Sequence, residues 1–180
     1  MKTEKDSSKL DIIKNAEKVT EEAILSIKEI CTNLSPHILK NYGLISAIKK
    51  FTDKVSEPGI LNIDFQTNVK SFRLQNNVEV VVYRAVCELI NNTVKHSGAR
   101  NVSINLSYNI SNKVLDIFYD DDGQGCKISE ILEGETLGMG LQNIQSRIST
   151  LDGFINFESK LDNGFHAYIS VNTDLIDNNV

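Results

Sequence analysis

The segment from Asn76 to Ser97 constrains the fold most, because its residues have the spacing of a helix with two different faces. One face is apolar, includes Thr93, and suits a hydrophobic core. Glu88 and Asn92 lie one turn apart on the other face, and Asn92 and Lys95 three residues apart, so these side chains can meet at one ligand. Their oxygens suit Mg²⁺ and the ammonium suits a phosphate. The polar face carries Arg84, Glu88, Asn91, Asn92 and Lys95. On this segment alone, an ordinary amphipathic helix remains the alternative.

Apolar residues at every second position predict strands on both sides of this helix. The last two strands flank Asp162-Asn163-Gly164, which is a strong signal for a short hairpin turn. The expected strands are Ile60 to Thr67, Val102 to Tyr108, Val114 to Tyr119, Phe154 to Lys160, and Phe165 to Val171.

Two further helices are expected around this sheet, at Leu39 to Val55 and from Gly138 to about Leu151. We therefore predict an α+β fold from Leu39 onward. It is a two-layer α/β sandwich, with a mixed sheet of about five strands and three helices on one face. A long N-terminal helix precedes it.

That N-terminal helix, from Leu10 to Leu34, has a narrow apolar seam at a spacing of three and four residues. A narrow seam favours pairing with another helix, and packing on its own domain is the alternative. Ser35-Pro36 is expected to end the helix. The seam consists of Leu10, Ile13, Ile24, Ile27, Cys31 and Leu34.

Composition excludes several classes of protein. The net charge of −5 argues against broad nucleic-acid binding, which needs a basic surface. Cys31, Cys87 and Cys126 are far apart and odd in number, which argues against a disulfide framework or a zinc site. No apolar run is long enough for a membrane span, and the first residues lack a signal-peptide core. We expect a cytoplasmic chain, so that any membrane anchor of a longer protein would lie outside this sequence.

Two glycine motifs follow the central helix. Asp121-x-Gly123-x-Gly125 comes directly after a strand, where a carboxylate can accept hydrogen bonds from an exocyclic amine and glycine permits a close backbone approach. Gly138-x-Gly140-Leu141 opens a helix, whose free N–H groups suit phosphates. Between them, Cys126 to Leu137 is polar and predicts a lid. Each motif alone also occurs in plain turns.

The order of these motifs resembles the GHKL ATPase superfamily. Glu88 to His96 corresponds to its N box, Asp121 to Gly125 to its first glycine box, and Gly138 to Leu141 to its second. A closer resemblance is to the catalytic domain of sensor histidine kinases that pair with LuxR-type response regulators, in Tyr83 to Glu88, Asn92 to Ser97, Asp121 to Gly125 and Gly138 to Ile148. Leu34 to Leu39 and Gly43 to Ile48 resemble the exit from the second helix of that family's dimerisation hairpin.

This resemblance implies a role for each residue of the motifs. Catalysis would depend on Glu88, Asn92 and Lys95, with Asn92 ligating Mg²⁺ and Glu88 orienting the metal's ligands or polarising the attacking group. Lys95 and His96 would contact the phosphates or ribose of ATP. Asp121 would accept a hydrogen bond from adenine. The remaining contacts to base and phosphates would come from Gly123, Gly125, Gly138, Gly140 and Leu141.

The chain departs from the family pattern in two respects. Phe165 follows Gly164 where the family often has threonine, which removes an expected hydroxyl near the adenine. The first helix of the dimerisation hairpin, with its phosphoacceptor histidine, is absent. None of His37, His96 and His166 has the expected setting. Either the chain is a fragment that begins after that helix, or it acts on another chain.

The resemblance implies two regions, 1–36 as the second helix of a dimerisation hairpin and 37–174 as an ATP-binding catalytic domain. The polar residues from Asp174 to Val180 predict a frayed end of the chain, with 175–180 as a disordered tail. The implied function is transfer of the ATP γ-phosphate to a histidine outside this chain, for relay to a response regulator. Homodimers would form through the N-terminal helix. The alternatives are a GHKL protein-serine kinase of the anti-sigma type and a nucleotide-binding, helix-pairing module without turnover.

Overall fold

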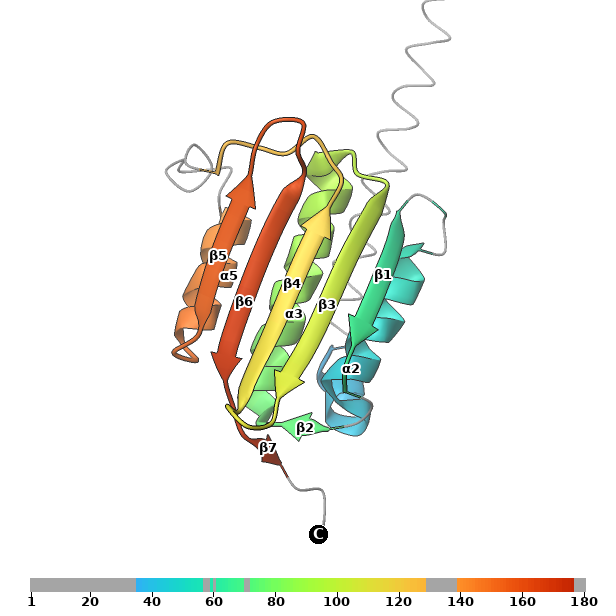
Figure 1. Ribbon diagram of the computed structural model, residues 1–180. Helices are drawn as coiled ribbons and strands as arrows, with labels where there is room; N and C mark the ends of the chain where they lie inside the picture. The colour runs from blue at the N-terminus through green and yellow to red at the C-terminus, as the bar shows by residue number, and fades with distance from the viewer. Residues whose placement is uncertain (1–34, 57–58, 60, 70–71, 129–138, 177–180) are drawn as a thin grey trace, which may run out of the picture.

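The computed structural model describes residues 35–56, 59, 61–69, 72–128 and 139–176 (Figure 1). Three helices lie on one face of a five-stranded sheet with the strand order β1-β3-β4-β6-β5. The strands are β1 (Asn62–Thr67), β3 (Asn101–Asn109), β4 (Val114–Asp121), β5 (Phe154–Ser159) and β6 (Phe165–Asn172). The helices are α2 (Ser35–Ser56), α3 (Asn76–Asn92) and α5 (Met139–Ser149). The predicted two-layer sandwich is confirmed. The expected helix from Leu10 to Leu34 lies outside the described residues.

The sheet is mixed, as predicted. Strand β1 runs parallel to β3, and the other neighbouring strands are antiparallel. Its buried face meets the apolar side of α3 in one core, which includes the fully buried Ile104, Ile117 and Ile169. On the opposite face Phe118 stacks on Tyr168 with 4.8 Å between ring centroids. The alternation of strand residues thus separates core from surface.

Helix α2 begins earlier than predicted. It is helical from Ser35, and Pro36 lies in its first turn. A proline is tolerated there because backbone N–H groups of the first turn have no partner within the helix. The helix is instead interrupted at Gly43, whose φ of 76° and ψ of 177° are not helical. A side chain at Gly43 would come within 3.1 Å of Arg73 Cδ. The interruption therefore lies where another segment packs against α2.

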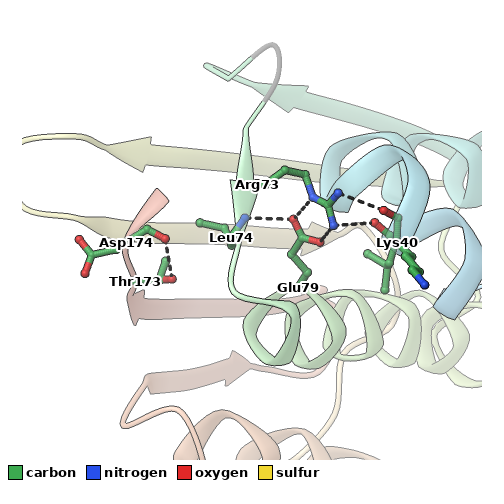
Figure 2. Close-up of polar contacts among 7 residues, drawn as sticks. Lys40, Arg73, Leu74, Glu79, Thr173 and Asp174 are labelled. Carbon is green, nitrogen blue, oxygen red and sulfur yellow. Dashed lines mark hydrogen bonds and ion pairs between the residues drawn. The ribbon is translucent and has the colours of Figure 1, made fainter. Parts of the chain in front are cut away.

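Arg73 joins three segments at this point (Figure 2). Its guanidinium contacts both carboxylate oxygens of the buried Glu79 at 3.0 Å. It also donates to the carbonyl oxygens of Leu39 and Lys40, at 3.1 and 3.0 Å. Glu79 accepts a further bond from the Leu74 amide. The first part of α2 is thereby tied to α3 and to the short strand β2 (Arg73–Leu74).

The predicted helix from Asn76 to Ser97 has two parts. Helix α3 is α-helical, and the final segment η1 (Thr93–Ser97) is π-helical, a wider turn that often occurs at functional sites. The predicted C-cap is confirmed, since Gly98 has a φ of 65°.

The expectation of a tail without structure from Asp174 onward is wrong for its first residues. Leu175 and Ile176 form strand β7, which pairs with Leu74 and Arg73 of β2. The hydroxyl of Tyr108 also donates to the Thr173 carbonyl at 2.9 Å. These partners hold the segment, while residues 177–180 lie outside the described part of the chain.

Candidate functional site

A cavity of about 350 Å³ opens between α3, η1, the segment after β4, and the start of α5. This volume lies within the range of small-molecule sites in proteins. Its lining combines apolar walls with a few polar groups. The lining residues are Leu89, Asn92, Thr93, His96, Ser97, Asp121, Gln124, Gly125, Cys126, Gly140, Leu141 and Phe165. Parts of all three predicted motifs therefore face one cavity.

Asp121, at the end of β4, is only 6% exposed and is held in a fixed orientation. One carboxylate oxygen accepts the Gly123 amide at 2.9 Å, and the other accepts the Thr93 hydroxyl at 2.6 Å. The Tyr119 hydroxyl lies 2.6 Å from the same Thr93 oxygen. Since Thr93 has a single hydroxyl proton, which goes to Asp121, Tyr119 must be the donor to Thr93.

Burial raises the pKa of Tyr119 far above its ordinary value, so the phenol keeps its proton and remains a donor. The chain of bonds runs from Tyr119 to Thr93 to Asp121. A carboxylate has about four acceptor sites. Asp121 therefore retains capacity for an amine entering the cavity.

Thr93 is a site residue that the sequence reasoning missed. Its position on the apolar stripe predicted a core residue, and it is indeed buried. The available signal was its hydroxyl, because a buried hydroxyl needs a hydrogen-bond partner. Nothing in the helical spacing identified Asp121 as that partner.

The glycines of the first motif are needed for packing between loops. A side chain at Gly123 would lie 2.7 Å from the Ser97 carbonyl oxygen. One at Gly125, where φ is +65°, would collide with the Lys160 carbonyl. The loop is fixed further by the Gln124 amide, which donates to the Ser97 carbonyl at 2.8 Å. These contacts account for both glycines without a ligand, although Gly125 also lines the cavity.

Gly140 brings the N box and the second glycine motif together. A side chain at this position would lie 2.8 Å from Glu88 Oε1 and 3.3 to 3.4 Å from the amide group of Asn92. Both side chains therefore border the start of α5. Gly138 lies outside the described residues.

These oxygens fit the coordination chemistry of Mg²⁺. Glu88 and Asn92 offer hard donors beside one glycine. The described residues contain no group of three His, Cys, Asp or Glu side chains that would hold a metal alone.

Lys95 and His96 both lie in η1, but only His96 is among the residues that line the cavity. Partial removal of the His96 ring from water lowers its pKa, and the charge of Lys95 lowers it further. The ring is therefore neutral near pH 7. The His96 carbonyl accepts a bond from the Gln124 side chain at 2.7 Å.

Phe165 follows Gly164 in the sequence, where the family pattern often has threonine. It lines the cavity and packs against Phe157 with 5.8 Å between ring centroids. The wall on the β6 side is thus aromatic. This suits a planar ring more than a polar contact.

Known proteins include sequences and structures that are similar to this chain. No protein-family model matches the chain. Over 150 residues it is 32% identical to the sensor histidine kinase ComP of Bacillus subtilis (strain 168). The chain is a relative of the sensor histidine kinases. The match covers 83% of this chain, which spans only 19% of the length of ComP.

Solved structures of histidine kinases share the fold. The histidine kinase domain of the blue-light activated kinase EL346 from Erythrobacter litoralis matches with a TM-score of 0.56 at 15% identity, over 72% of this chain and 60% of that one. Full-length ShkA in complex with AMPPNP matches with a TM-score of 0.57 at 15% identity, over 73% of this chain and 30% of ShkA.

The described residues contain no helix that is long and apolar enough to cross a membrane.

Proposed function

We propose that this chain is the ATP-binding catalytic region of a two-component sensor histidine kinase. It transfers the γ-phosphate of ATP to a histidine that is not present in this chain, for relay to a response regulator with a LuxR-type output domain. The kinship with ComP supports the class of enzyme. The complex of ShkA with AMPPNP supports an adenine nucleotide as the ligand of this fold.

One observation carries the proposal. The cavity has the oriented carboxylate of Asp121 in its wall and Asn92 and Gly140 in the same lining, with Glu88 beside Gly140. An adenine nucleotide requires two features at the two ends of its site. One is an acceptor for the amine of the base, and the other is a cluster of hard oxygens at the start of a helix, near the phosphates.

In this proposal Asp121 binds the adenine amine, and Phe165 and Leu141 pack on the base. Asn92 ligates Mg²⁺, which neutralises phosphate charge when it is bound. The backbone at Gly140 and the side chains of Lys95 and His96 bind the phosphates or ribose, as does Gly138. Glu88 orients the ligands of the metal or polarises the attacking group. Catalysis is then positioning and charge neutralisation, as in other phosphoryl transfers.

The wider assembly is part of the same proposal. The complete protein forms a homodimer through the helix expected at residues 10–34, and the chain works on the cytoplasmic side, where ATP is available. The acceptor histidine is none of the three in this chain. His96 and His166 lie within the domain itself, in η1 and β6.

Thermal unfolding with nucleotide tests the proposal. At about 100 times its dissociation constant, Mg-ADP or Mg-AMPPNP should stabilise the chain by about 2.7 kcal/mol, which raises the Tm by roughly 5–10 °C. EDTA should reduce the rise. A folded protein whose Tm does not change with either nucleotide would overturn the assignment.

The Asn92→Ala variant tests the metal ligand. We expect it to fold and to lose the magnesium-dependent part of the shift, because the amide oxygen beside Gly140 is removed. Asn105→Ala is the matched control, since Asn105 is exposed on β3. Equal magnesium-dependent shifts in both variants would exclude Asn92 as the ligand.

A further inference from the structure

A second cavity, of about 300 Å³, lies between α3 and α5. Figure 1 shows these helices on the same face of the sheet. It shares no lining residue with the candidate nucleotide cavity. Its lining is Arg84, Cys87, Glu88, Asn91, Asn143, Ile144 and Arg147. Neither the resemblance nor the proposed function assigns a role to this cavity.

Two arginines from different helices face this space, Arg84 from α3 and Arg147 from α5. Within the described part of the chain, neither forms an ion pair. Arg73, by contrast, is fully engaged with Glu79 and two carbonyls. The cavity therefore presents two guanidinium groups to a ligand, against one carboxylate from Glu88.

The chemistry of the lining selects the ligand class. A guanidinium presents paired donors that match the oxygens of a carboxylate or phosphate. The Asn143 amide adds neutral donors to the same wall. The local excess of positive charge contrasts with the net charge of −5 for the whole chain. A small oxyanion fits both the charge and the volume.

We propose that this cavity is an oxyanion site, in which Arg84 and Arg147 bind a carboxylate or phosphate group from opposite helices. Glu88 lines this cavity, and its Oε1 also borders Gly140, which lines the nucleotide cavity. A bound anion would thus lie beside the residue that connects the two sites. The oxyanion site does not depend on nucleotide binding.

Arginine NMR tests the proposal sharply, because the chain has only four arginines: Arg73, Arg84, Arg100 and Arg147. In the full chain labelled with ¹⁵N-arginine, the Nε–Hε signals are followed during titration with sodium phosphate at constant ionic strength. Saturating Mg-ADP is added first, so that phosphate cannot occupy the nucleotide cavity. We expect saturable shifts of Arg84 and Arg147 with one common Kd. Arg73 and Arg100 are internal controls.

A second titration with an acetylated and amidated triglutamate peptide distinguishes a carboxylate source from free phosphate. Saturation by either probe supports the site, and the tighter one identifies the source. Arg84→Gln should weaken binding as reported by Arg147 at least about tenfold, and Arg147→Gln should do the same for Arg84. Arg100→Gln should change nothing.

Two results would overturn the proposal. One is a shift of Arg84 and Arg147 that stays linear and no larger than that of Arg100 with both probes. The other is binding at Arg147 that is unaffected by Arg84→Gln in a variant whose remaining spectrum shows the native fold. A failure of Mg-ADP to bind would contradict the proposed function and leave this test intact.

Discussion

At the scale of single residues, the site depends on a carboxylate oriented by two donors. Asp121 accepts hydrogen bonds from the Gly123 amide and the Thr93 hydroxyl, and Tyr119 donates a hydrogen bond to Thr93 in turn. Such an acceptor has already lost its mobility before a ligand arrives, which favours binding. The Asp-x-Gly pattern predicted Asp121 from the sequence. Thr93 and Tyr119 were identified only from the contact between η1 and β4 in the structure.

We expect Asp121→Asn to weaken Mg-ADP binding roughly 10- to 100-fold, because a hydrogen bond to a charged group contributes about 1.5–3 kcal/mol. Asp120→Asn is the matched control on the same strand, since Asp120 contacts His166 rather than the cavity. Isothermal titration calorimetry measures both. An unchanged affinity in Asp121→Asn would remove Asp121 from the adenine site.

The pair of His166 and Asp120 predicts a small dependence of stability on pH. Its Nδ1···Oδ1 distance is 2.6 Å, and the bond to Asp120 raises the pKa of His166. A raised pKa in the folded state stabilises the protein below the unfolded value of about 6.5, and this contribution is lost as pH rises through the folded value. Because both side chains are largely exposed, the effect should stay below about 1 kcal/mol.

Urea unfolding of the parent protein and Asp120→Asn should therefore differ near pH 5.5 and converge near pH 9. In ¹H NMR titrations, Asp120→Asn should lower the pKa of His166 and leave that of His96 unchanged. A difference in stability that grows toward pH 9 would contradict this assignment.

At the scale of elements, the strands and hairpins followed the predicted pattern closely. The period of two and the turn at Asp162-Asn163-Gly164 act over a few neighbouring residues. Two features of the helices were not predictable in this way. The break at Gly43 is matched to Arg73, and the π-helical turn η1 carries Thr93 toward β4. Both depend on a partner segment distant in the sequence.

Gly98 and Gly125 have the same φ of +65°, so a comparison of the two distinguishes the cost of backbone strain from the cost of packing. A Cβ atom added at Gly98 would meet no described atom within 4 Å, whereas one at Gly125 would face the carbonyls of Lys160 and Gly164. Gly98→Ala should cost about 1–2 kcal/mol of unfolding free energy from the left-handed conformation alone. Gly125→Ala should cost a further 1–3 kcal/mol, roughly, because backbone atoms must move.

Urea denaturation measures both variants, and Mg-ADP affinity provides a second readout. We expect reduced affinity only for Gly125→Ala, since Gly125 lines the cavity. Equal losses of stability in the two variants would show that the loop after β4 adjusts freely to the added carbon.

At the scale of the whole molecule, the fold joins segments that are distant in the sequence at two places. Strand β1 pairs with β3, although the whole of α3 lies between them in the sequence. This connection sets the helices on one face of the sheet. At the other end of the molecule, Arg73 links α2, β2 and α3 through Glu79, Leu39 and Lys40 (Figure 2). The position of α2 on the domain therefore depends on one buried ion pair as well as on apolar packing.

Breaking this pair should be costly. Glu79 is completely buried and Arg73 is 25% exposed. We expect Glu79→Gln to lower the unfolding free energy by about 3 kcal/mol, at the lower end for buried pairs because Arg73 keeps some contact with water. A double-mutant cycle with Arg73→Met measures the coupling.

The pair of Lys113 and Asp174 is the control for this cycle. Its distance is similarly short, at 2.6 Å, but both side chains are more than 60% exposed. Its coupling should be much smaller than that of Arg73 and Glu79, because water screens an exposed pair. Comparable couplings for the two pairs would contradict the structural importance of Arg73.

Local patterning was sufficient to establish the α+β sandwich, the hairpins, the Gly98 cap and the three motifs that face the cavity, because each depends on residues close together in the chain. The tertiary structure alone decided which groups meet. It placed Thr93 against Asp121, packed Gly125 on Lys160, and paired Leu175 with Leu74. It also brought Arg84 and Arg147 to one cavity. These contacts join segments far apart in sequence, so their geometry exists only once the helices have packed on the sheet.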